Sequence, residues 1–316
     1  MANQSRSATF PPVIDSTIIA SFTDCPLKCY REYFLRLGSE DPSIHLHAGG
    51  CFAKAIEVVR RNRWELELPF KECLEAAFSA FVKKWGAYDS VPDHGTGANK
   101  TFDRVWSAVE YYFEQFPIES DPIKPHIFAD GRSGVEFSFA VPLPLQNPDT
   151  GEPVLYAGRF DLLGYYNDLH AVIDEKTTTA LGRTWPDQWT MRGQMYGYVW
   201  GARQSGVNCR TAIIRGVAIL KTKFNHLEVI KTGIYTDKLL DRWYGQMLNK
   251  VQYMISLYRL QKESETEPEQ IWPMNYGSAF MTCTLCPFED LCTSENPEIW
   301  YGDYGERTWN PLTEDD

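Results

Sequence analysis

Three charged residues follow directly on an apolar run in the sequence HAVIDEKTTT, which occupies residues 170–179. The apolar part is typical of a buried β-strand, which would normally continue or stop where these charges begin. Because successive side chains of a strand point to opposite faces, we expect Asp174 and Lys176 on one face and Glu175 on the other. If the preceding strand, LYAGRFDLLGYY, pairs with it as a hairpin neighbour, Asp161 comes close to Asp174. The sequence therefore predicts a carboxylate–lysine site at one edge of a sheet.

Such a site suits a divalent metal ion. Two carboxylates and a main-chain carbonyl provide the hard oxygen ligands that Mg²⁺ and Mn²⁺ prefer. A lysine two positions along the strand can contact a water molecule on the metal, or the phosphate that the water attacks. Metal-assisted phosphodiester hydrolysis needs these parts: a Lewis acid, an activated water and charge neutralisation. The alternative interpretation of Asp-Glu-Lys at a strand end is a solvated terminus without chemistry.

The order of the expected elements predicts an α/β fold. Helical periodicity dominates up to about residue 122, for example in FKECLEAAFSAFVKKW and TFDRVWSAVEYYFEQF. Strand patterns follow, together with the helical segments PDQWTMRGQMYGYVWGARQ and TDKLLDRWYGQMLNKVQYMISLYRLQK. We therefore divide the chain into a flexible N-terminus (1–14), a helical region (15–122), an α/β core (123–262) and a cysteine-rich segment with an acidic tail (263–316).

Charge and hydropathy limit the classes of function. The 316 residues carry a formal net charge of −11, which argues against sequence-independent nucleic-acid binding through a basic surface. This argument is weak for an enzyme that holds divalent metals, since such an enzyme needs clustered carboxylates. No run of roughly eighteen apolar residues exists, and the N-terminal residues show no secretory signal. We therefore expect a cytoplasmic protein with no membrane association.

The motifs around this strand end resemble the active-site core of the PD-(D/E)XK nucleases, in their RecB-like branch. In that family a Gly-Arg-hydrophobic-Asp strand precedes a strand with Asp-x-Lys-Thr, and GRFDLL and VIDEKTTT match these motifs. The resemblance implies that Asp161 and Asp174 bind metal, that the Glu175 carbonyl assists, and that Lys176 orients or deprotonates the attacking water. It also implies a restriction-endonuclease-like fold, with a mixed central sheet flanked by helices and a nuclease core at residues 123–262.

A further motif of the family lies downstream, in the segment QMYGY. It places Gln194 and Tyr198 at the positions of the family's Gln-x-x-x-Tyr helix. In the family these two residues help to position the lysine and the DNA backbone, and the resemblance implies the same role here.

The chain departs from the family in one motif. The family's helix of the form Gly-x-x-x-His-x-x-hydrophobic-Glu corresponds to GGCFAKAIE, where Gly49 and Glu57 align but Ala53 stands in place of the histidine. Glu57, one helical turn later, could supply a carboxylate to the metal instead. His45 and His47 lie upstream at the wrong register, and we expect them in a loop.

The eight cysteines are expected to be buried residues or metal ligands, because a long chain without a secretory signal rarely carries a disulfide framework. CTLCPFEDLC holds Cys283, Cys286 and Cys292, which leaves one position of a four-ligand site unfilled. FTDCPLKCYREYF resembles the Cys-Pro helix that opens the RecB-like domain. In the family's iron–sulfur members one N-terminal cysteine joins three C-terminal ones, so the resemblance implies a [4Fe-4S] cluster completed by Cys25. Structural Zn²⁺ with four thiolates is the alternative.

Taken together, the resemblance implies a Mg²⁺- or Mn²⁺-dependent DNA exonuclease with a structural [4Fe-4S] cluster. A chain of this kind suits a recombination or repair system of a phage, in the host cytoplasm, with a helicase or recombinase as partner. Ala53 motivates an alternative, a catalytically inactive DNA-binding or scaffold subunit, and a structure-specific endonuclease is a third reading. For DNA contacts we expect Arg183 and Arg192 on phosphates and Trp189 stacked on single-stranded bases.

Overall fold

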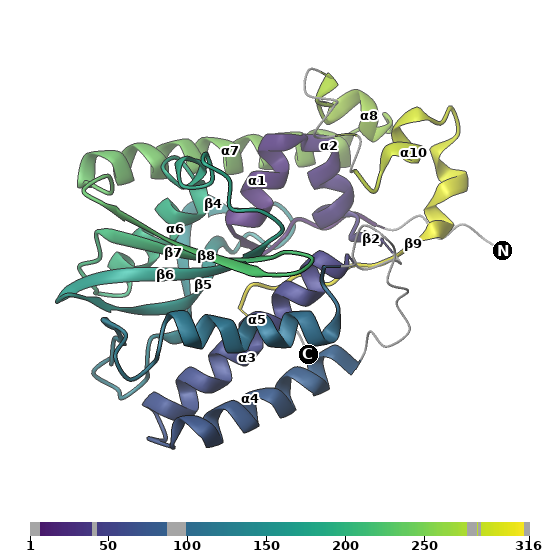
Figure 1. Ribbon diagram of the computed structural model, residues 1–316. Coiled ribbons are helices and arrows are strands. Elements are labelled where there is room, and N and C mark those ends of the chain that lie inside the picture. The colour runs from purple at the N-terminus through teal and green to yellow at the C-terminus, as the bar shows by residue number, and fades with distance from the viewer. Residues whose placement is uncertain (1–6, 40–42, 87–98, 277–282, 284–285, 313–316) are drawn as a thin grey trace. The chain divides into compact units, whose positions relative to one another are not determined.

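The computed structural model describes residues 7–39, 43–86, 99–276, 283 and 286–312 (Figure 1). The fold is α/β, with a mixed central sheet flanked by helices, as the sequence predicts. Packing divides the chain into two compact units, and the long strands β4 (Val135–Gln146) and β5 (Pro153–Tyr166) run through both. Unit 1 consists of Met1–Asp41, Phe139–Gly158 and Lys238–Asp316, and unit 2 of Pro42–Ser138 and Arg159–Asp237.

Unit 2 contains a mixed sheet in the order β3–β5–β6–β7–β8. β3 (Ile123–Pro125) and β6 (Leu169–Thr178) both pair antiparallel with β5. β7 (Thr211–Ile219) runs parallel to β6, and β8 (Phe224–Thr232) runs antiparallel to β7. A parallel pair needs a crossover connection, and α6 (Gly193–Gln204) lies in the crossover between β6 and β7.

Helices cover both faces of the unit 2 sheet. α3 (Ile44–Trp64) packs on β6 and α5 (Phe102–Gln115) on β7 and β8, while α4 (Phe70–Trp85) packs against α3. Figure 1 shows α6 on the other side of the sheet from α3 and α5. The side chains agree, because Glu175 contacts α3 and α5 whereas its neighbour Asp174 contacts α6, and neighbours in a strand face opposite ways.

The largest hydrophobic core of unit 2 lies between the helices α3, α4 and α5 and strand β7. Phe52, Phe81, Tyr112 and Val217 each come from a different one of these elements, and all four are buried. Periodicity explains why α5 is a helix, since burying every third or fourth residue places one face on the core. Its buried residues are Val105, Ala108, Val109, Tyr112 and Phe113.

Unit 1 contains short N-terminal and C-terminal elements together with the long helix α7 (Asp237–Glu263). β1 (Val13–Ile14) runs parallel to the start of β5, and β2 (Leu37–Ser39) pairs antiparallel with β9 (Tyr304–Glu306). Trp272 is fully buried and stacks on Tyr30 with ring centroids 4.6 Å apart. The remaining elements are α1 (Ser16–Asp24), α2 (Pro26–Cys29), the π-helical turn η1 (Tyr30–Phe34), α8 (Pro268–Ile271), α10 (Glu289–Thr293) and the 3₁₀ segment η5 (Pro297–Asp303).

Residues 1–6 of the N-terminal segment lie outside the described chain. Phe10 is buried, and its main-chain N–H donates to Asp149 Oδ2 at 2.7 Å. Asp15 caps α1, since its Oδ1 accepts from the main-chain N–H of Thr17 at 3.0 Å and of Ile18 at 2.8 Å. The helical run of α1 and α2 breaks at Cys25, whose backbone is extended (φ −161°, ψ 110°). The break has a simple cause, because the residue before a proline is disfavoured in helical conformation.

α3 begins earlier than its sequence suggests. It starts at Ile44, so that His45 and His47 lie in its first turns and their expected place in a loop is wrong. Two glycines inside a helix cost about 2 kcal/mol relative to alanine. The helix persists because the residues around them, Ala48, Cys51 and Phe52, are buried in the core.

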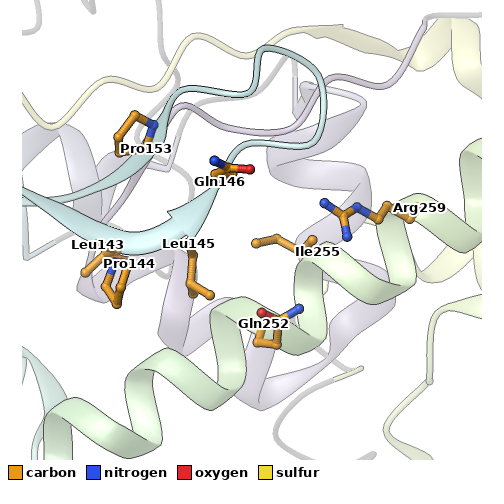
Figure 2. Close-up of a pocket in the computed structure, with 8 residues that line it drawn as sticks. All are labelled: Leu143, Pro144, Leu145, Gln146, Pro153, Gln252, Ile255 and Arg259. Carbon is orange, nitrogen blue, oxygen red and sulfur yellow. The ribbon is translucent and has the colours of Figure 1, made fainter.

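Unit 1 has a hollow of about 480 Å³ between the end of β4 and α7, and Figure 2 shows the residues that line it. Residues 143–146 and Pro153 form one wall, and Gln252, Ile255 and Arg259 form the other. Apart from Arg259 its lining side chains are uncharged, so it offers no carboxylate or imidazole for acid–base or metal chemistry. No helix in the described part of the chain is long and apolar enough to cross a bilayer.

A buried network of charges joins the helices of unit 2 to the sheet. Arg60 on α3 forms an ion pair with Glu175 on β6, and its Nη1 donates to Glu175 Oε2 at 3.1 Å. The Tyr112 hydroxyl on α5 donates to Glu175 Oε1 at 3.0 Å and accepts from Arg60 Nη2 at 3.1 Å. Arg215 on β7 donates to the same hydroxyl at 3.3 Å and pairs with Asp121. The two arginines are 3% and 2% exposed, so these charges are compensated by each other and not by water.

We predict that Arg60→Met destabilises the protein strongly at about pH 7, by about 3–5 kcal/mol, because it leaves the Glu175 carboxylate buried and unpaired. In the native protein burial raises the pKa of Glu175, but Arg60 and the other donors outweigh burial and hold it below its ordinary value. A depressed carboxyl pKa contributes stability above the ordinary pKa, about 4.3, and that stability is lost as the pH falls through the folded value. The difference between wild type and variant should therefore shrink as the pH falls toward that value.

Urea unfolding at several pH values measures this difference. Arg63→Met is the matched control on the same helix, since Arg63 is half-exposed and lies 3.6 Å from an exposed Glu119, and we expect it to cost less than about 1 kcal/mol. Equal losses for the two variants would contradict the importance of the Arg60–Glu175 pair.

Candidate active site

The antiparallel hairpin of β5 and β6 brings the predicted carboxylates together. Leu162 pairs with Ile173 in the ladder, and Asp161 and Asp174 are the next residue of each strand. Asp161 Oδ2 accepts a hydrogen bond from the main-chain N–H of Glu175 at 2.7 Å, so one carboxylate is tied directly to the other strand. The hairpin register therefore places both acids at one end of the strand pair.

Asp174 is the centre of the contacts at this place. It is completely buried, and the Lys176 ammonium lies 2.8 Å from its Oδ1 and 2.7 Å from its Oδ2. From α6, Gln194 Nε2 donates to Asp174 Oδ1 at 3.3 Å and to the Tyr198 hydroxyl at 3.1 Å. The Tyr198 ring packs edge-on against Phe160, with centroids 5.3 Å apart. The structure thus gathers Asp161, Asp174, Lys176, Gln194 and Tyr198 around one point.

The electrostatics of these groups are strongly coupled. Burial, and then the charge of Asp174, raise the pKa of Asp161 well above its ordinary range. Burial also raises the pKa of Asp174, against the lowering effect of Lys176. Burial lowers the pKa of Lys176, but Asp174 and Asp161 outweigh it and the net shift is upward. One lysine compensates two neighbouring carboxylates incompletely, and a divalent cation between them would lower the free energy of both.

The donor set fits a hard divalent cation. Asp174 Oδ2 is buried and accepts no hydrogen bond of good geometry, although the ammonium is near. Within the described residues no three His, Cys, Asp or Glu side chains are arranged to hold a metal ion. A metal held here would therefore take two carboxylates from the protein and complete its shell with main-chain oxygen and water, as Mg²⁺ commonly does.

The two glutamates predicted to assist the metal have other side-chain partners. The Glu175 carboxylate lies on the opposite face of β6 in the buried network, so that only its main-chain carbonyl remains for a metal. Glu57 on α3 accepts from Lys54 Nζ and from Arg61 Nε, each at 2.9 Å. Ala53 lies one turn before Glu57 and offers no ligand in place of the family's histidine.

Glu136 on β4 belongs to the same electrostatic group, and the sequence analysis missed it. Its Oε2 lies 3.0 Å from Arg159 Nε, and its charge contributes to the raised pKa of Asp161. Burial, opposed by Arg159 and reinforced by Glu57, raises the pKa of Glu136 to about 7. The sequence contained one clue to this residue. Arg159 stands two positions before Asp161 and shares its face of the strand, so an acidic partner of Arg159 lies close to Asp161.

The expected DNA-binding residues differ in accessibility. Arg183 and Arg192 are exposed, and the charge of Arg192 acts on Asp174, whose pKa it lowers. Trp189 is only 5% exposed, and its ring packs edge-on against Trp185 at 5.2 Å. A base cannot stack on Trp189 without displacing this packing, whereas both arginines are open to a phosphate.

The four cysteines of the predicted cluster all lie in unit 1, and all eight cysteines of the chain are free. The main-chain N–H of Cys286 donates to the Cys283 carbonyl at 2.8 Å. Burial raises the pKa of Cys286, and the charges of Cys292 and Cys25 raise it further, so these three thiols lie within electrostatic reach of one another. The buried guanidinium of Arg31 donates to Cys292 Sγ at 2.9 Å and to the Phe288 carbonyl at 3.3 Å.

Comparison with known proteins places the chain in a family. No curated protein matches it. Two solved structures have a weak likeness to it: a "Putative exonuclease" from Eubacterium rectale (TM-score 0.45, 12% identity, 78% of this chain and 82% of that chain) and SSO0001 (TM-score 0.33, 13% identity, 77% and 84%). The family model of the PD-(D/E)XK nuclease superfamily, whose members typically use divalent metals, matches residues 16–293. Because this match spans most of the sequence, including both strands of the carboxylate–lysine site, the chain belongs to the PD-(D/E)XK nuclease superfamily.

Proposed function

We propose that the protein is a divalent-metal-dependent DNA exonuclease. One observation carries the proposal: Asp174 is buried between Lys176 and Gln194, and Asp161 accepts a hydrogen bond from the main-chain N–H of Glu175, the residue after Asp174. This is the donor set that metal-assisted phosphodiester hydrolysis requires, at the place where the family carries its chemistry. Digestion from an end, and DNA as the substrate, rest on the resemblance to the RecB-like exonucleases.

Each residue has a definite task in this proposal. Asp161 and Asp174 would hold Mg²⁺ or Mn²⁺ together with the Glu175 carbonyl, and Glu57 or Glu136 would assist. When bound, the cation supplies Lewis-acid polarisation of the scissile phosphate. The Lys176 ammonium orients the attacking water and offsets the charge that develops on the phosphate. Gln194 and Tyr198 keep Asp174 in place, and Arg192 binds an adjoining phosphate.

The cellular role extends the same proposal. A nuclease of this kind would process DNA ends in recombination or repair, in the cytoplasm of a phage's host. A helicase or recombinase partner would open the duplex. The observation that favours a second candidate is Ala53, which removes one expected ligand and motivates an inactive DNA-binding or scaffold subunit.

We predict that anaerobically purified protein shortens end-labelled DNA in Mg²⁺ or Mn²⁺ and that EDTA abolishes this activity. Single-stranded and double-stranded substrates, labelled at either end, give the strand preference and the polarity of digestion. Circular single-stranded DNA should persist, because an exonuclease needs an end, and its cleavage would indicate an endonuclease. DNA binding without cleavage in any metal would support the scaffold alternative.

We predict that Asp174→Asn and Lys176→Gln each reduce the cleavage rate at least about 100-fold, since each removes a charge that acts on the reacting phosphate or its metal. Asp187→Asn is the matched control, because Asp187 is an exposed aspartate in the same unit and should leave the rate unchanged. Circular dichroism and thermal melting establish that the variants fold. Wild-type rates in either active-site variant would refute the assigned roles.

We also propose that Cys25, Cys283, Cys286 and Cys292 hold a structural [4Fe-4S] cluster. Four thiolates are the usual donors for such a cluster, and the effect of Cys292 and Cys25 on the pKa of Cys286 supports the grouping. The Arg31 guanidinium lies beside this group, since its Nη1 donates to Cys292 Sγ at 2.9 Å. When bound, the cluster supplies cross-links between the two ends of unit 1. Four-thiolate Zn²⁺ remains the alternative cofactor.

We predict that anaerobically purified protein is brown and contains about four iron and four sulfide per chain. Cys292→Ala should lose most of the iron, whereas Cys209→Ala, which removes a buried thiol bonded to main-chain carbonyls in unit 2, should keep it. Elemental analysis separates the outcomes, since stoichiometric zinc with no sulfide would establish the alternative. Iron content unaffected by Cys292→Ala would exclude this residue as a ligand.

A further inference from the structure

Lys100 is a buried cation without an acidic partner. It is 4% exposed and directly precedes Thr101, the N-cap residue of α5. Its ammonium donates to Thr177 Oγ1 at 3.3 Å, and no carboxylate among the described residues forms an ion pair with it. Burial lowers the pKa of Lys100, and no charge offsets this effect. A buried ammonium costs free energy unless an anion compensates it.

Among the described residues, no group near Lys100 brings negative charge to it. His45, in the first turn of α3, is exposed, and burial and the charge of Lys100 both lower its pKa, so the two groups lie within electrostatic reach. The N-terminus of α3 has no acidic residue in its first turn and no side-chain cap from Ser43. Helix N-termini carry unsatisfied N–H groups and a partial positive charge. With its lowered pKa, His45 is neutral at about pH 7, so its imidazole can offer an N–H to an anion that the Lys100 ammonium attracts.

Thr177 links this cationic group to the candidate active site. It follows Lys176 in β6, and its side chain lies on the opposite face, toward α3 and α5. A Cβ on Gly49 of α3 would lie 3.5 Å from Thr177 Oγ1, so α3 comes close to the strand end at this point. The Lys176 ammonium and the Lys100–Thr177 pair therefore flank the same end of β6 from its two faces.

We propose that Lys100, Thr177, His45 and the N-terminus of α3 form a binding site for a phosphate group, occupied by a backbone phosphate of the nucleic-acid substrate next to the one that is cleaved. This inference rests on the proposed nuclease function, because it takes the substrate to lie across the end of β6. The Lys100 ammonium and the Thr177 hydroxyl donate to the phosphate oxygens, and the helix N–H groups and His45 add to the attraction. Contacts of this kind fix the position of the strand without reading its sequence.

The test compares Lys100→Gln with wild type in binding a fluorescent oligothymidylate in EDTA, where no cleavage occurs. We expect about a tenfold weaker Kd, the effect of losing one charge-assisted contact. The slope of log K against log salt should flatten by about 0.7, the value for one phosphate of a single strand. Lys71→Gln is the control, because Lys71 is 87% exposed and lies 3.9 Å from Glu75, and it should bind as wild type does. Unchanged affinity and slope in Lys100→Gln would overturn the proposal.

Thermal melting with inorganic phosphate separates binding from a structural role. Phosphate should raise the Tm of wild type and not that of Lys100→Gln. Without phosphate the variant should melt at the same temperature or higher, since it lacks the uncompensated charge. A lower Tm with no phosphate effect in either protein would make Lys100 structural and overturn the site. If phosphate raises the Tm of wild type but Lys100→Gln binds oligothymidylate with the wild-type Kd, the assignment of the site to a nucleic-acid phosphate is wrong.

The outcomes also distinguish this inference from the proposed function. If wild type cleaves DNA and Lys100→Gln binds and cleaves like it, the phosphate site fails and the nuclease stands. If wild type cleaves no DNA but Lys100→Gln binds about tenfold more weakly with the flatter salt slope, the site stands and the catalytic proposal fails. In an active enzyme we expect KM to rise about tenfold with kcat within about twofold, because the contact is present in both the ground and transition states.

Discussion

The buried ion pair between Arg60 and Glu175 is the constraint on which the arrangement of this site depends. β6 carries three consecutive charges into a sheet that is covered by helices on both faces, so each charge needs a partner on its own side. Arg60 and Tyr112 donate hydrogen bonds to the carboxylate of Glu175, the middle of the three, on the face covered by α3 and α5. Because Glu175 is held on this face, its neighbours Asp174 and Lys176 must point to the opposite face of the sheet, toward α6. The pair therefore fixes the direction in which the carboxylate–lysine site opens.

A buried pair of this kind is rarely optimal for stability alone, since apolar residues of similar volume are often as stable or more so. Here the pair specifies the register in which β6 joins the sheet. A slip of β6 by one residue would exchange its two faces, placing Glu175 against Asp161 and burying Asp174 and Lys176 among the helices. Such a register leaves Arg60 without its carboxylate partner in the interior. The network thus penalises an alternative pairing that would destroy the site.

Much of this could be predicted from the sequence, because it depends on local periodicity. The two-residue period of β6 sorts its charges correctly by face, and the four-residue spacing of Gln194 and Tyr198 places them on one side of α6. What could not be predicted are partners distant in sequence. Arg60 and Tyr112 are ordinary charged or aromatic positions in their own segments, and they meet at Glu175 only through the fold. Trp189 illustrates the same limit. Its position near charged motifs suggests stacking on a base, and only the fold shows that its ring is buried.

The same alternation explains why the end of β6 has two cationic faces. On the α6 face, carboxylates compensate the charge of Lys176. A divalent cation would bind those carboxylates, and the Lys176 ammonium would then be available to a phosphate. On the α3 face the carboxylate of Glu175 is already fully used by Arg60 and Tyr112, so it is not available to Lys100, which contacts Thr177 two residues further along β6. A chain with a net charge of −11 can thus present positive charge locally, because its acids are engaged where the strand ends. The overall charge of such a protein is a poor guide to nucleic-acid binding, and the pairing of each acid decides the local potential.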